Sequence, residues 1–166
     1  MIIKGSAIKL GDNINTDFII SGRYKFSITD IKELAKHIME DIDPDFPSKI
    51  APGNSVIVAG NNFGMGSSRE QAPLVIKEAG ITAVLAKKFA RIFYRNAFNI
   101  GLTLIETDTD KIDENDVIEI DMDKGVVKNI TKDIELNIKP LPEFMQKLIN
   151  EGGLINYVKK YGELKF

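Results

Sequence analysis

The chain has 166 residues, 43% of them hydrophobic and 28% charged, and a formal net charge of −2. These values are typical of a globular domain with its own core, so we expect residues 1–166 to form one domain. The two signs of charge are interspersed without a basic stripe, which argues against a nucleic-acid partner. No apolar run has the length of a membrane span and no signal-peptide pattern opens the chain. We therefore expect a cytoplasmic protein without a membrane partner.

The chain contains no cysteine and one histidine, His37. The sequence therefore excludes disulfides, a cysteine nucleophile and an iron–sulfur cluster bound through thiolates of this chain alone. A polyhistidine metal site is excluded as well, and we expect no metal on this chain. His37 lies off the apolar stripe of its segment, so we expect an exposed side chain without a catalytic role.

The first third of the chain predicts a strand, a polar loop and a helix. Residues 1–9 alternate loosely between apolar and polar, as a strand does. Asp17 follows a turn signal, where a carboxylate most often caps a turn. Residues 21–27 are expected to form a loop with a dense mixture of cations and aromatic rings. Asp30-x-x-Glu33 then predicts a helix start, and the apolar residues that follow share one helical face.

The central stretch combines a buried strand, three glycines and a cluster of hydroxyls. An apolar run over residues 56–59 predicts the strand, and glycines follow at 60, 64 and 66. Ser67-x-x-Glu70 and Ser68-x-x-Gln71 both fit a capping box, so we expect a helix to begin here. Pro73 removes a backbone donor about one turn later. Either the first turn is loose, or the regular helix begins after the capping signal.

A strand, a glycine loop and a helix N-terminus can gather free N–H groups around an anion. Gly64 and Gly66 would form the cradle, since glycine permits positive φ and the close approach of a ligand. Arg69 adds a charge with the fork geometry suited to a carboxylate or a phosphate. The spacing fits neither a P-loop nor a dinucleotide fingerprint. The alternative, judged on the loop alone, is a turn that binds nothing.

The remaining residues change from parallel to antiparallel strand signals. Residues 82–86 and 103–105 predict strands on either side of a helix over 89–99, and this alternation predicts parallel pairing. Arg91 and Arg95 on that helix are expected to support the site rather than to bind substrate. Three alternating segments then predict antiparallel strands, followed by two terminal helices separated by a pair of glycines. We expect an α/β fold: a mixed sheet flanked by helices, with a small antiparallel, barrel-like part packed on it.

Three ordered motifs resemble the swivelling domain of the aconitase superfamily. The motifs are Gly11-Asp12-Asn13-Ile14-Asn15-Thr16-Asp17 with Gly22-Arg23-Tyr24, then Gly64-x-Gly66-Ser67-Ser68-Arg69-Glu70, and Lys88 to Ala97 with Asn99-x-Gly101-Leu102. The resemblance covers nearly the whole chain. Within the superfamily it is strongest to the free-standing small subunits of isopropylmalate dehydratase and its near relatives. It implies the swivelling β/β/α fold.

The resemblance also implies an activity, that of a heteromeric hydro-lyase. Such enzymes move a hydroxyl between adjacent carbons by removing water and adding it back. In the family the first serine of the Ser-Ser-Arg run is the base, which implies Ser67 as the catalytic residue. Ser68 and Arg69 would bind a substrate carboxylate, and Asp17 would orient these groups or the substrate. The family's 4Fe-4S cluster would lie on a cysteine-bearing large subunit, in a heterodimer or heterotetramer with this chain.

The sequence leaves the substrate open. By resemblance, the loop after Asp17 contacts the variable side of a di- or tricarboxylate, through Arg23, Tyr24, Lys25 and Phe26. If that loop is extended, alternation places the two rings on one side and the two cations on the other. We expect the rings to face the substrate, which favours isopropylmalate and leucine biosynthesis. Inward cations would instead favour a homoaconitase substrate, and 2,3-dimethylmalate is a further alternative.

Two hypotheses of other classes compete with the enzyme subunit. One is a non-catalytic anion-binding module that uses the same loop, and the other is a structural partner of a larger protein. Each rival explains one motif, whereas the enzyme subunit explains all three. Replacing Ser67 by alanine separates them, because only the enzyme needs the hydroxyl for chemistry.

Overall fold

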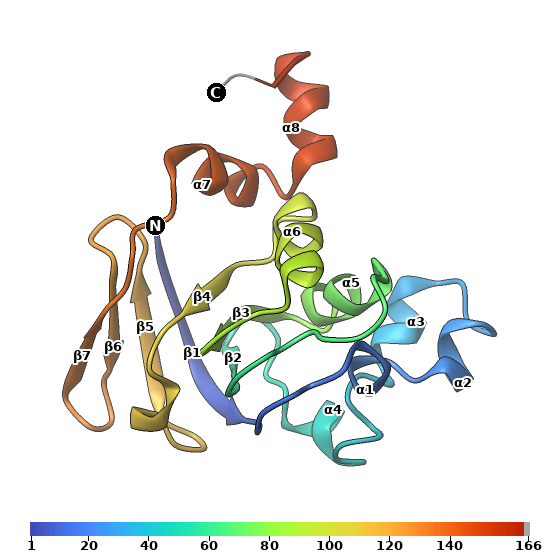
Figure 1. Cartoon of the computed structure of the whole chain (residues 1–166), viewed down its shortest axis with the longest axis horizontal. Coiled ribbons are helices and arrows are strands. Elements are labelled where there is room, and N and C mark those ends of the chain that lie inside the picture. Colours follow the sequence, from blue (N-terminus) through green and yellow to red (C-terminus); the bar gives the residue numbers. More distant parts are fainter. Residues whose placement is uncertain (165–166) are drawn as a thin grey trace.

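The computed structural model describes residues 1–164, and these residues are arranged around a mixed sheet in the strand order β4-β3-β2-β1-β5-β6-β7 (Figure 1). The strands are β1 (Ile2–Lys9), β2 (Ser55–Val58), β3 (Ile81–Ala86), β4 (Leu104–Glu106), β5 (Val117–Asp121), β6 (Val126–Asn129) and β7 (Ile134–Asn137). β1 to β4 pair in parallel, and β5 to β7 continue the sheet from β1 in antiparallel pairing. This confirms the predicted α/β fold and its change from parallel to antiparallel strands. The antiparallel part is a direct continuation of the sheet, joined to it through β1.

The sheet curls over one of its faces. Val58 on β2, Leu85 on β3 and Ile105 on β4 share a buried cluster with Ile120 on β5 and Val127 on β6. Side chains from the two ends of a sheet meet in this way only if the sheet bends around them, which gives a half-barrel. The barrel-like character predicted for the antiparallel part is therefore a property of the whole sheet.

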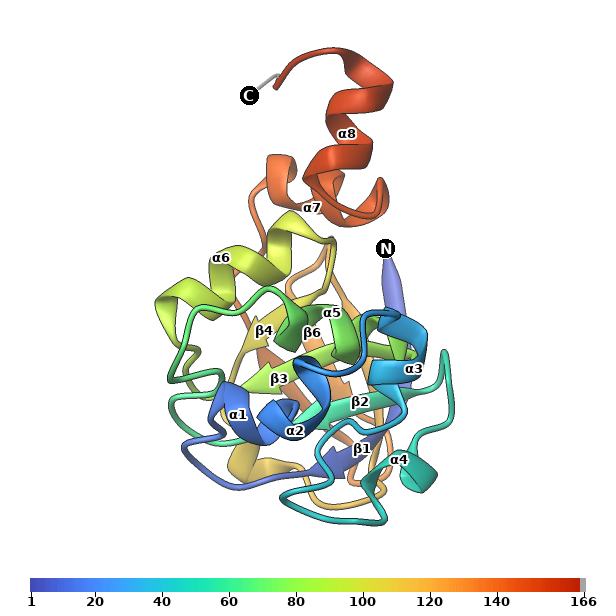
Figure 2. The same cartoon turned by 90° about the vertical axis from the view of Figure 1, so that its right-hand side faces the viewer.

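Helices cover the opposite face of the sheet (Figure 2). The helices are α1 (Thr16–Ile19), α2 (Gly22–Lys25), α3 (Ile31–Ala35), α4 (Phe46–Lys49), α5 (Gln71–Glu78), α6 (Arg91–Asn99), α7 (Glu143–Asn150) and α8 (Leu154–Tyr161), with a 3-10 turn η1 (Thr109–Lys111). Ile19, Leu34, Val75 and Phe93 from four of them pack on sheet residues such as Ile57. The last two helices stand away from the sheet, with α8 farthest out. Among residues 1–164, no helix has the length and apolar character needed to cross a membrane.

Several local predictions differ from the structure. The serines at 67 and 68 do not cap α5, which begins at Gln71 behind Glu70 and lacks a side-chain cap. The second of the two possibilities that Pro73 raised is the one observed. The expected loop over 21–27 contains the helical turn α2, so strand-like alternation does not apply there. On the helix predicted over 89–99, Ile92 is 53% exposed, whereas Phe98 is buried.

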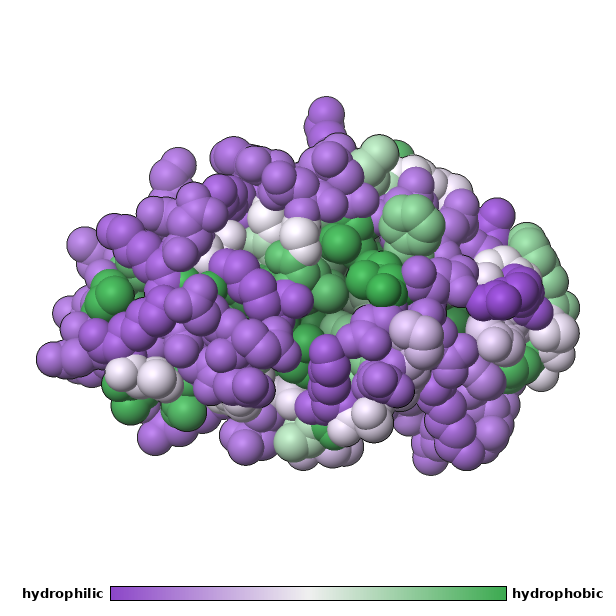
Figure 3. All heavy atoms as spheres, turned by 90° about the horizontal axis from the view of Figure 1, so that it is seen from below, coloured by the Kyte–Doolittle hydropathy of each residue, from purple (hydrophilic) through white to green (hydrophobic). Residues whose placement is uncertain are grey.

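Figure 3 looks at the molecule from the end at which β1 terminates. Apolar residues gather in a hollow at the middle of this face, and hydrophilic residues surround them. The loops at this end therefore leave part of the apolar interior visible at the surface.

Candidate active site

The loop between β2 and α5 lies between two other segments of the chain. On one side, the Gly64 amide donates to the Ile14 carbonyl at 2.8 Å, and the Thr16 amide donates to Met65 at 2.9 Å. On the other, the Phe63 amide donates to Lys88 at 3.0 Å, and Phe63 accepts from Ala90 at 2.8 Å. These bonds bring together the three motifs that are far apart in the sequence.

Two glycines allow this close approach. Gly64 has φ +84°, and a Cβ there would lie 2.2 Å from Cγ of Phe93. Gly66 has φ +100°, and its Cβ would lie 2.6 Å from Oδ1 of Asn15. That Asn15 oxygen accepts from the Asp17 amide at 2.9 Å and caps α1. Any larger residue would combine an unfavourable backbone conformation with a steric overlap, so both positions require glycine.

A cavity of about 200 Å³ opens where the three motifs meet. It is lined by Thr16, Gly64, Gly66, Ser67, Ser68, Arg69, Ala90, Arg91, Ile92, Phe93 and Asn96. The Ser-Ser-Arg run therefore lines a cavity whose lining combines hydroxyls and arginines with apolar groups. A larger cavity of about 610 Å³, between β4 and residues 137–142, contains none of that run.

Thr16 fixes the backbone of the serine run, and the sequence analysis did not single it out. Its side chain is buried, and its Oγ1 donates to the carbonyl of Ser67 at 3.1 Å. The same Oγ1 lies 3.4 Å from Oγ of Ser67. A threonine in a turn is ordinarily exposed, so its only sequence signal was its place in the first motif. Its role follows from a contact between residues 51 positions apart.

The failed capping prediction matters for the chemistry. Because Ser67 and Ser68 do not cap α5, their hydroxyls are not used by the helix. Across residues 1–164, the amide N–H groups of Ser67 and Ser68 have no hydrogen-bond acceptor in the protein. Free donors and hydroxyls beside a helix N-terminus are a suitable environment for a negative charge.

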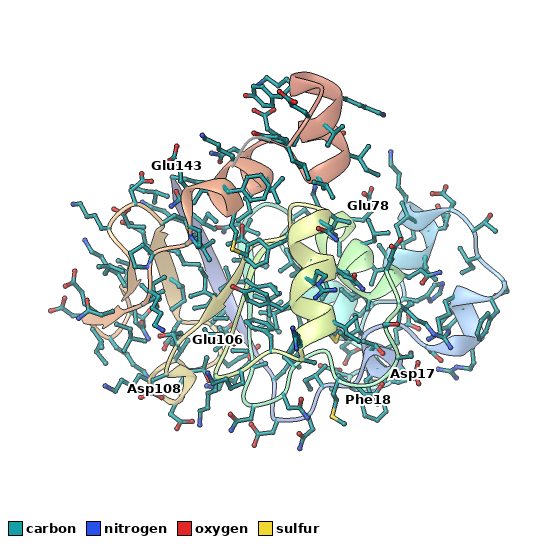
Figure 4. All side chains as sticks on the ribbon, turned by 45° about the horizontal axis from the view of Figure 1, so that its top comes forward. Asp17, Phe18, Glu78, Glu106, Asp108 and Glu143 are labelled. Atoms are coloured by element: carbon teal, nitrogen blue, oxygen red, sulfur yellow. The ribbon has the colours of Figure 1, made fainter. Side chains whose placement is uncertain are left out.

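Asp17 and Lys25 form an ion pair beside the cavity. Nζ of Lys25 lies 2.7 Å from Oδ1 of Asp17, and the side chains are 2% and 58% exposed, respectively. The hydrogen bond from Lys25 is the main reason that the pKa of Asp17 is lowered from 3.8. Burial opposes the shift, and the charges of Lys25 and Arg69 add to it. Figure 4 shows Asp17 next to Phe18 on α1.

Phe26 lies over Arg69. The guanidinium carbon of Arg69 is 5.0 Å from the centroid of the Phe26 ring, and Nζ of Lys25 is 5.9 Å from the same centroid. The ring is nevertheless 78% exposed. Phe26, Lys25, Asp17 and Arg69 therefore form a connected group at the edge of the cavity.

Arg23 and Tyr24, the other two candidates from this segment, point elsewhere. The guanidinium of Arg23 pairs with Asp41. The Tyr24 ring stacks on His37 with centroids 3.9 Å apart, and Nδ1 of His37 lies 3.1 Å from Glu40. The expectation that His37 is exposed is wrong, because its side chain is half-buried in this stack. The helical turn α2 separates the two rings that an extended loop would have placed together.

The side chains of this chain do not fit a cysteine-bound cluster. The sequence has no cysteine, and residues 1–164 contain no group of histidine, aspartate and glutamate side chains arranged to hold a metal ion. The cavity offers hydroxyls, amides and arginines instead, which are ligands for a carboxylate rather than for a metal.

The half-barrel and the glycine-loop site define a class of protein. The family model described as the aconitase C-terminal domain matches residues 14–110, which include the first motif from Ile14 onward, the other two motifs in full and every residue lining the site.

Individual relatives extend the match to the whole chain. The 3-isopropylmalate dehydratase small subunit 2 of Archaeoglobus fulgidus is 58% identical over 165 residues, which is 99% of each chain. The 3-isopropylmalate dehydratase small subunit of Thermodesulfovibrio yellowstonii is 56% identical over 96% of this chain and 95% of its own. The crystal structure of 3-isopropylmalate dehydratase from Methanocaldococcus jannaschii superposes with a TM-score of 0.92 at 50% identity, covering 98% and 96% of the two chains. The chain belongs to the 3-isopropylmalate dehydratase small-subunit family, which carries the aconitase C-terminal domain.

Proposed function

We propose that this chain is the small subunit of a hydro-lyase that interconverts 2-isopropylmalate and 3-isopropylmalate by dehydration and rehydration, a step of leucine biosynthesis. The observation that carries the proposal is the Ser67 hydroxyl, which does not cap α5 and lies in a cavity with Ser68 and Arg69. The relatives, which are similar over nearly their full length, bear the name of that enzyme.

Ser67 is proposed as the base. Its alkoxide would take the proton from the carbon next to a substrate carboxylate and become the neutral hydroxyl, while hydroxide leaves the adjacent carbon and becomes water with a proton from a general acid of the partner subunit. Rehydration returns the proton and places the hydroxyl on the other carbon. A serine hydroxyl is a weak acid, so the alkoxide needs preorganised donors. The free amides at 67 and 68, the charge of Arg69 and Thr16 beside Oγ are the groups available for this purpose.

The geometry of α2 bears on the substrate. Lys25 is buried against Asp17, so its charge is already compensated. The ring of Phe26 is exposed beside Arg69, so it offers the substrate an apolar wall. This arrangement supports a branched alkyl side group over the extra carboxylate of a homoaconitase substrate, since a carboxylate against the ring would lack a partner. Arg23 and Tyr24 would act only by holding α2.

The active enzyme is proposed to need a large subunit, in a heterodimer or heterotetramer. Three exposed apolar side chains, Phe18, Phe26 and Ile92, lie near the cavity and would be covered by that partner. The 4Fe-4S cluster would be held by cysteines of the large subunit. We also propose that this chain acts as a single domain and that the complex is cytoplasmic.

The test is reconstitution with the large subunit, comparing wild type with Ser67→Ala. Loss of a base is expected to lower kcat by about 10²- to 10⁴-fold while the complex still assembles. The ratio of kcat/KM for isopropylmalate to that for cis-homoaconitate then tests the substrate, and isopropylmalate should be preferred. A Ser67→Ala complex with normal turnover would return the chain to the anion-binding class.

A further inference from the structure

We propose that Phe26 is a positioning residue, whose ring holds the Arg69 guanidinium ready for a substrate carboxylate. The inference rests on the proposed function, in which Arg69 binds that carboxylate. Phe26 would act through Arg69 and does not need to touch the reacting atoms.

Arg69 lies beside the Phe26 ring without a charged partner in the described part of the chain. Over residues 1–164 its guanidinium has no ion pair and no hydrogen-bond acceptor, and its central carbon lies 5.0 Å from the centroid of the Phe26 ring. This distance is within the range of a cation–π interaction. A long side chain on a glycine-rich loop would otherwise sample many rotamers, and ordering it at the moment of binding would weaken affinity.

The contact between Phe26 and Arg69 is aromatic rather than ionic. A carboxylate partner would use the N–H donors of the guanidinium and would have to be displaced by the substrate. An aromatic ring contacts the face of the guanidinium and leaves the donors at its edge free. A ring therefore orients Arg69 without competing for the ligand.

The Phe26 ring is held in position by its place in the chain. Phe26 follows the helical turn α2, which is tied to α1 by the bond between Lys25 and Asp17 at 2.7 Å. Lys25 also approaches the ring, but its charge is compensated by Asp17, whereas that of Arg69 is not. Core packing does not explain the phenylalanine, because its side chain is 78% exposed.

The contact is tested directly by NMR of the isolated chain. The side-chain Nε–H signal of Arg69 is assigned by its disappearance in Arg69→Lys. The ring current of Phe26 should displace this signal in wild type and in Phe26→Tyr, and Phe26→Leu should remove the displacement. Phe18→Leu is the matched control, because its exposed ring lies on the neighbouring α1 and no cation of residues 1–164 lies over it, and it should leave the signal unchanged. An Arg69 signal that does not respond to Phe26→Leu would overturn the inference.

Kinetics of the assembled enzyme test the consequence. Phe26→Leu should raise KM about three- to tenfold with little change in kcat. Phe26→Tyr, which keeps an aromatic ring, should have the KM of wild type. In an Arg69→Gln background, Phe26→Leu should lower kcat/KM much less than it does in wild type, because the ring then has no guanidinium to hold and only its apolar contact with the substrate changes. An equal loss in both backgrounds would mean that the ring only packs, and would reject the positioning role. If wild type turns over no isopropylmalate, the proposed function fails, and the NMR experiment still decides whether Phe26 holds Arg69.

Discussion

Lys25 is the residue whose environment differs most from what its type suggests. Lysine is rarely buried unless it is paired, and this side chain is 2% exposed with Asp17 as its partner. Breaking such a pair from the acidic side leaves a buried charge without compensation. The pair therefore ties α1 to α2 at the edge of the cavity, and the stability of the fold should depend on it.

Asp17→Asn should destabilise the isolated chain in a pH-dependent manner. The pKa of Asp17 is lowered from 3.8 by Lys25, so the ionised carboxyl group stabilises the folded state. That contribution is complete above the unfolded-state pKa and disappears as the pH falls through the lower folded-state value. We expect a loss of about 1–2 kcal/mol at neutral pH, below the range for fully buried pairs because Asp17 is largely exposed. Urea unfolding of both proteins at several pH values measures it.

The control is a pair that is exposed on both sides. Lys128 and Glu135 lie 3.7 Å apart across β6 and β7, and Glu135→Gln should change stability by less than about 0.5 kcal/mol at any pH. Asp17→Asn should lower the free energy of unfolding less at pH 3 than at pH 7. An equal loss at the two pH values would contradict the ion-pair explanation.

At the scale of elements, the loop between β2 and α5 is held by close backbone contacts rather than by its own regular structure. Residues on both sides of it bond to its backbone, and Phe93 of α6 lies where a Gly64 side chain would be. The position of α6 and the shape of the cavity are therefore coupled through one glycine.

Gly64→Ala should cost much more stability than the same change at Gly53. The two glycines have similar φ values, +84° and +77°, so the backbone penalty of about 1–2 kcal/mol is common to both. A Cβ at Gly53 meets no atom within 4 Å, whereas at Gly64 it overlaps Phe93. Overpacking should add about 1–3 kcal/mol or more to the loss at Gly64. The midpoints of urea unfolding give the comparison, and equal losses would show that Phe93 moves aside freely.

At the scale of the whole molecule, we expect the fold to supply one side of a site that a second chain completes. The cavity has hydroxyls, amides and arginines from three segments but no residues for a cysteine-bound cluster. The sheet closes only into a half-barrel, and apolar residues are visible at the end where β1 terminates (Figure 3). Such a molecule is suited to work against a second chain.

The isolated chain should therefore be colourless and inactive. After anaerobic treatment with iron and sulfide and then desalting, it should show no absorbance at about 400 nm, because it lacks thiolates. The large subunit, treated in the same way, is the positive control. Turnover should appear only when the two are mixed and co-elute. Brown colour retained by this chain alone would contradict the assignment of the cluster to the partner.

The sequence by itself determined the type and order of most elements, but not the short helical turn α2. Hydrophobic residues that recur every two or every 3.6 positions or so mark the buried face of a strand or a helix. The strands, α6 and the terminal helices were therefore predicted with the correct type. The Ser-Ser-Arg run was also placed correctly in the glycine-rich loop between a buried strand and a helix, although its serines do not cap that helix. The motifs gave the family, and the matching relatives confirm it.

The tertiary structure alone decided which side chains meet. Thr16 reaches Ser67 across 51 positions, and Phe26 lies on Arg69, contacts for which no local pattern exists. The α2 turn separates the two rings that an extended loop would have placed together, with Tyr24 on His37 and Phe26 by Arg69, and it buries Lys25 against Asp17. Local preference follows from neighbours in the chain, whereas these contacts depend on how distant segments pack, and packing can override a capping signal or an alternating pattern.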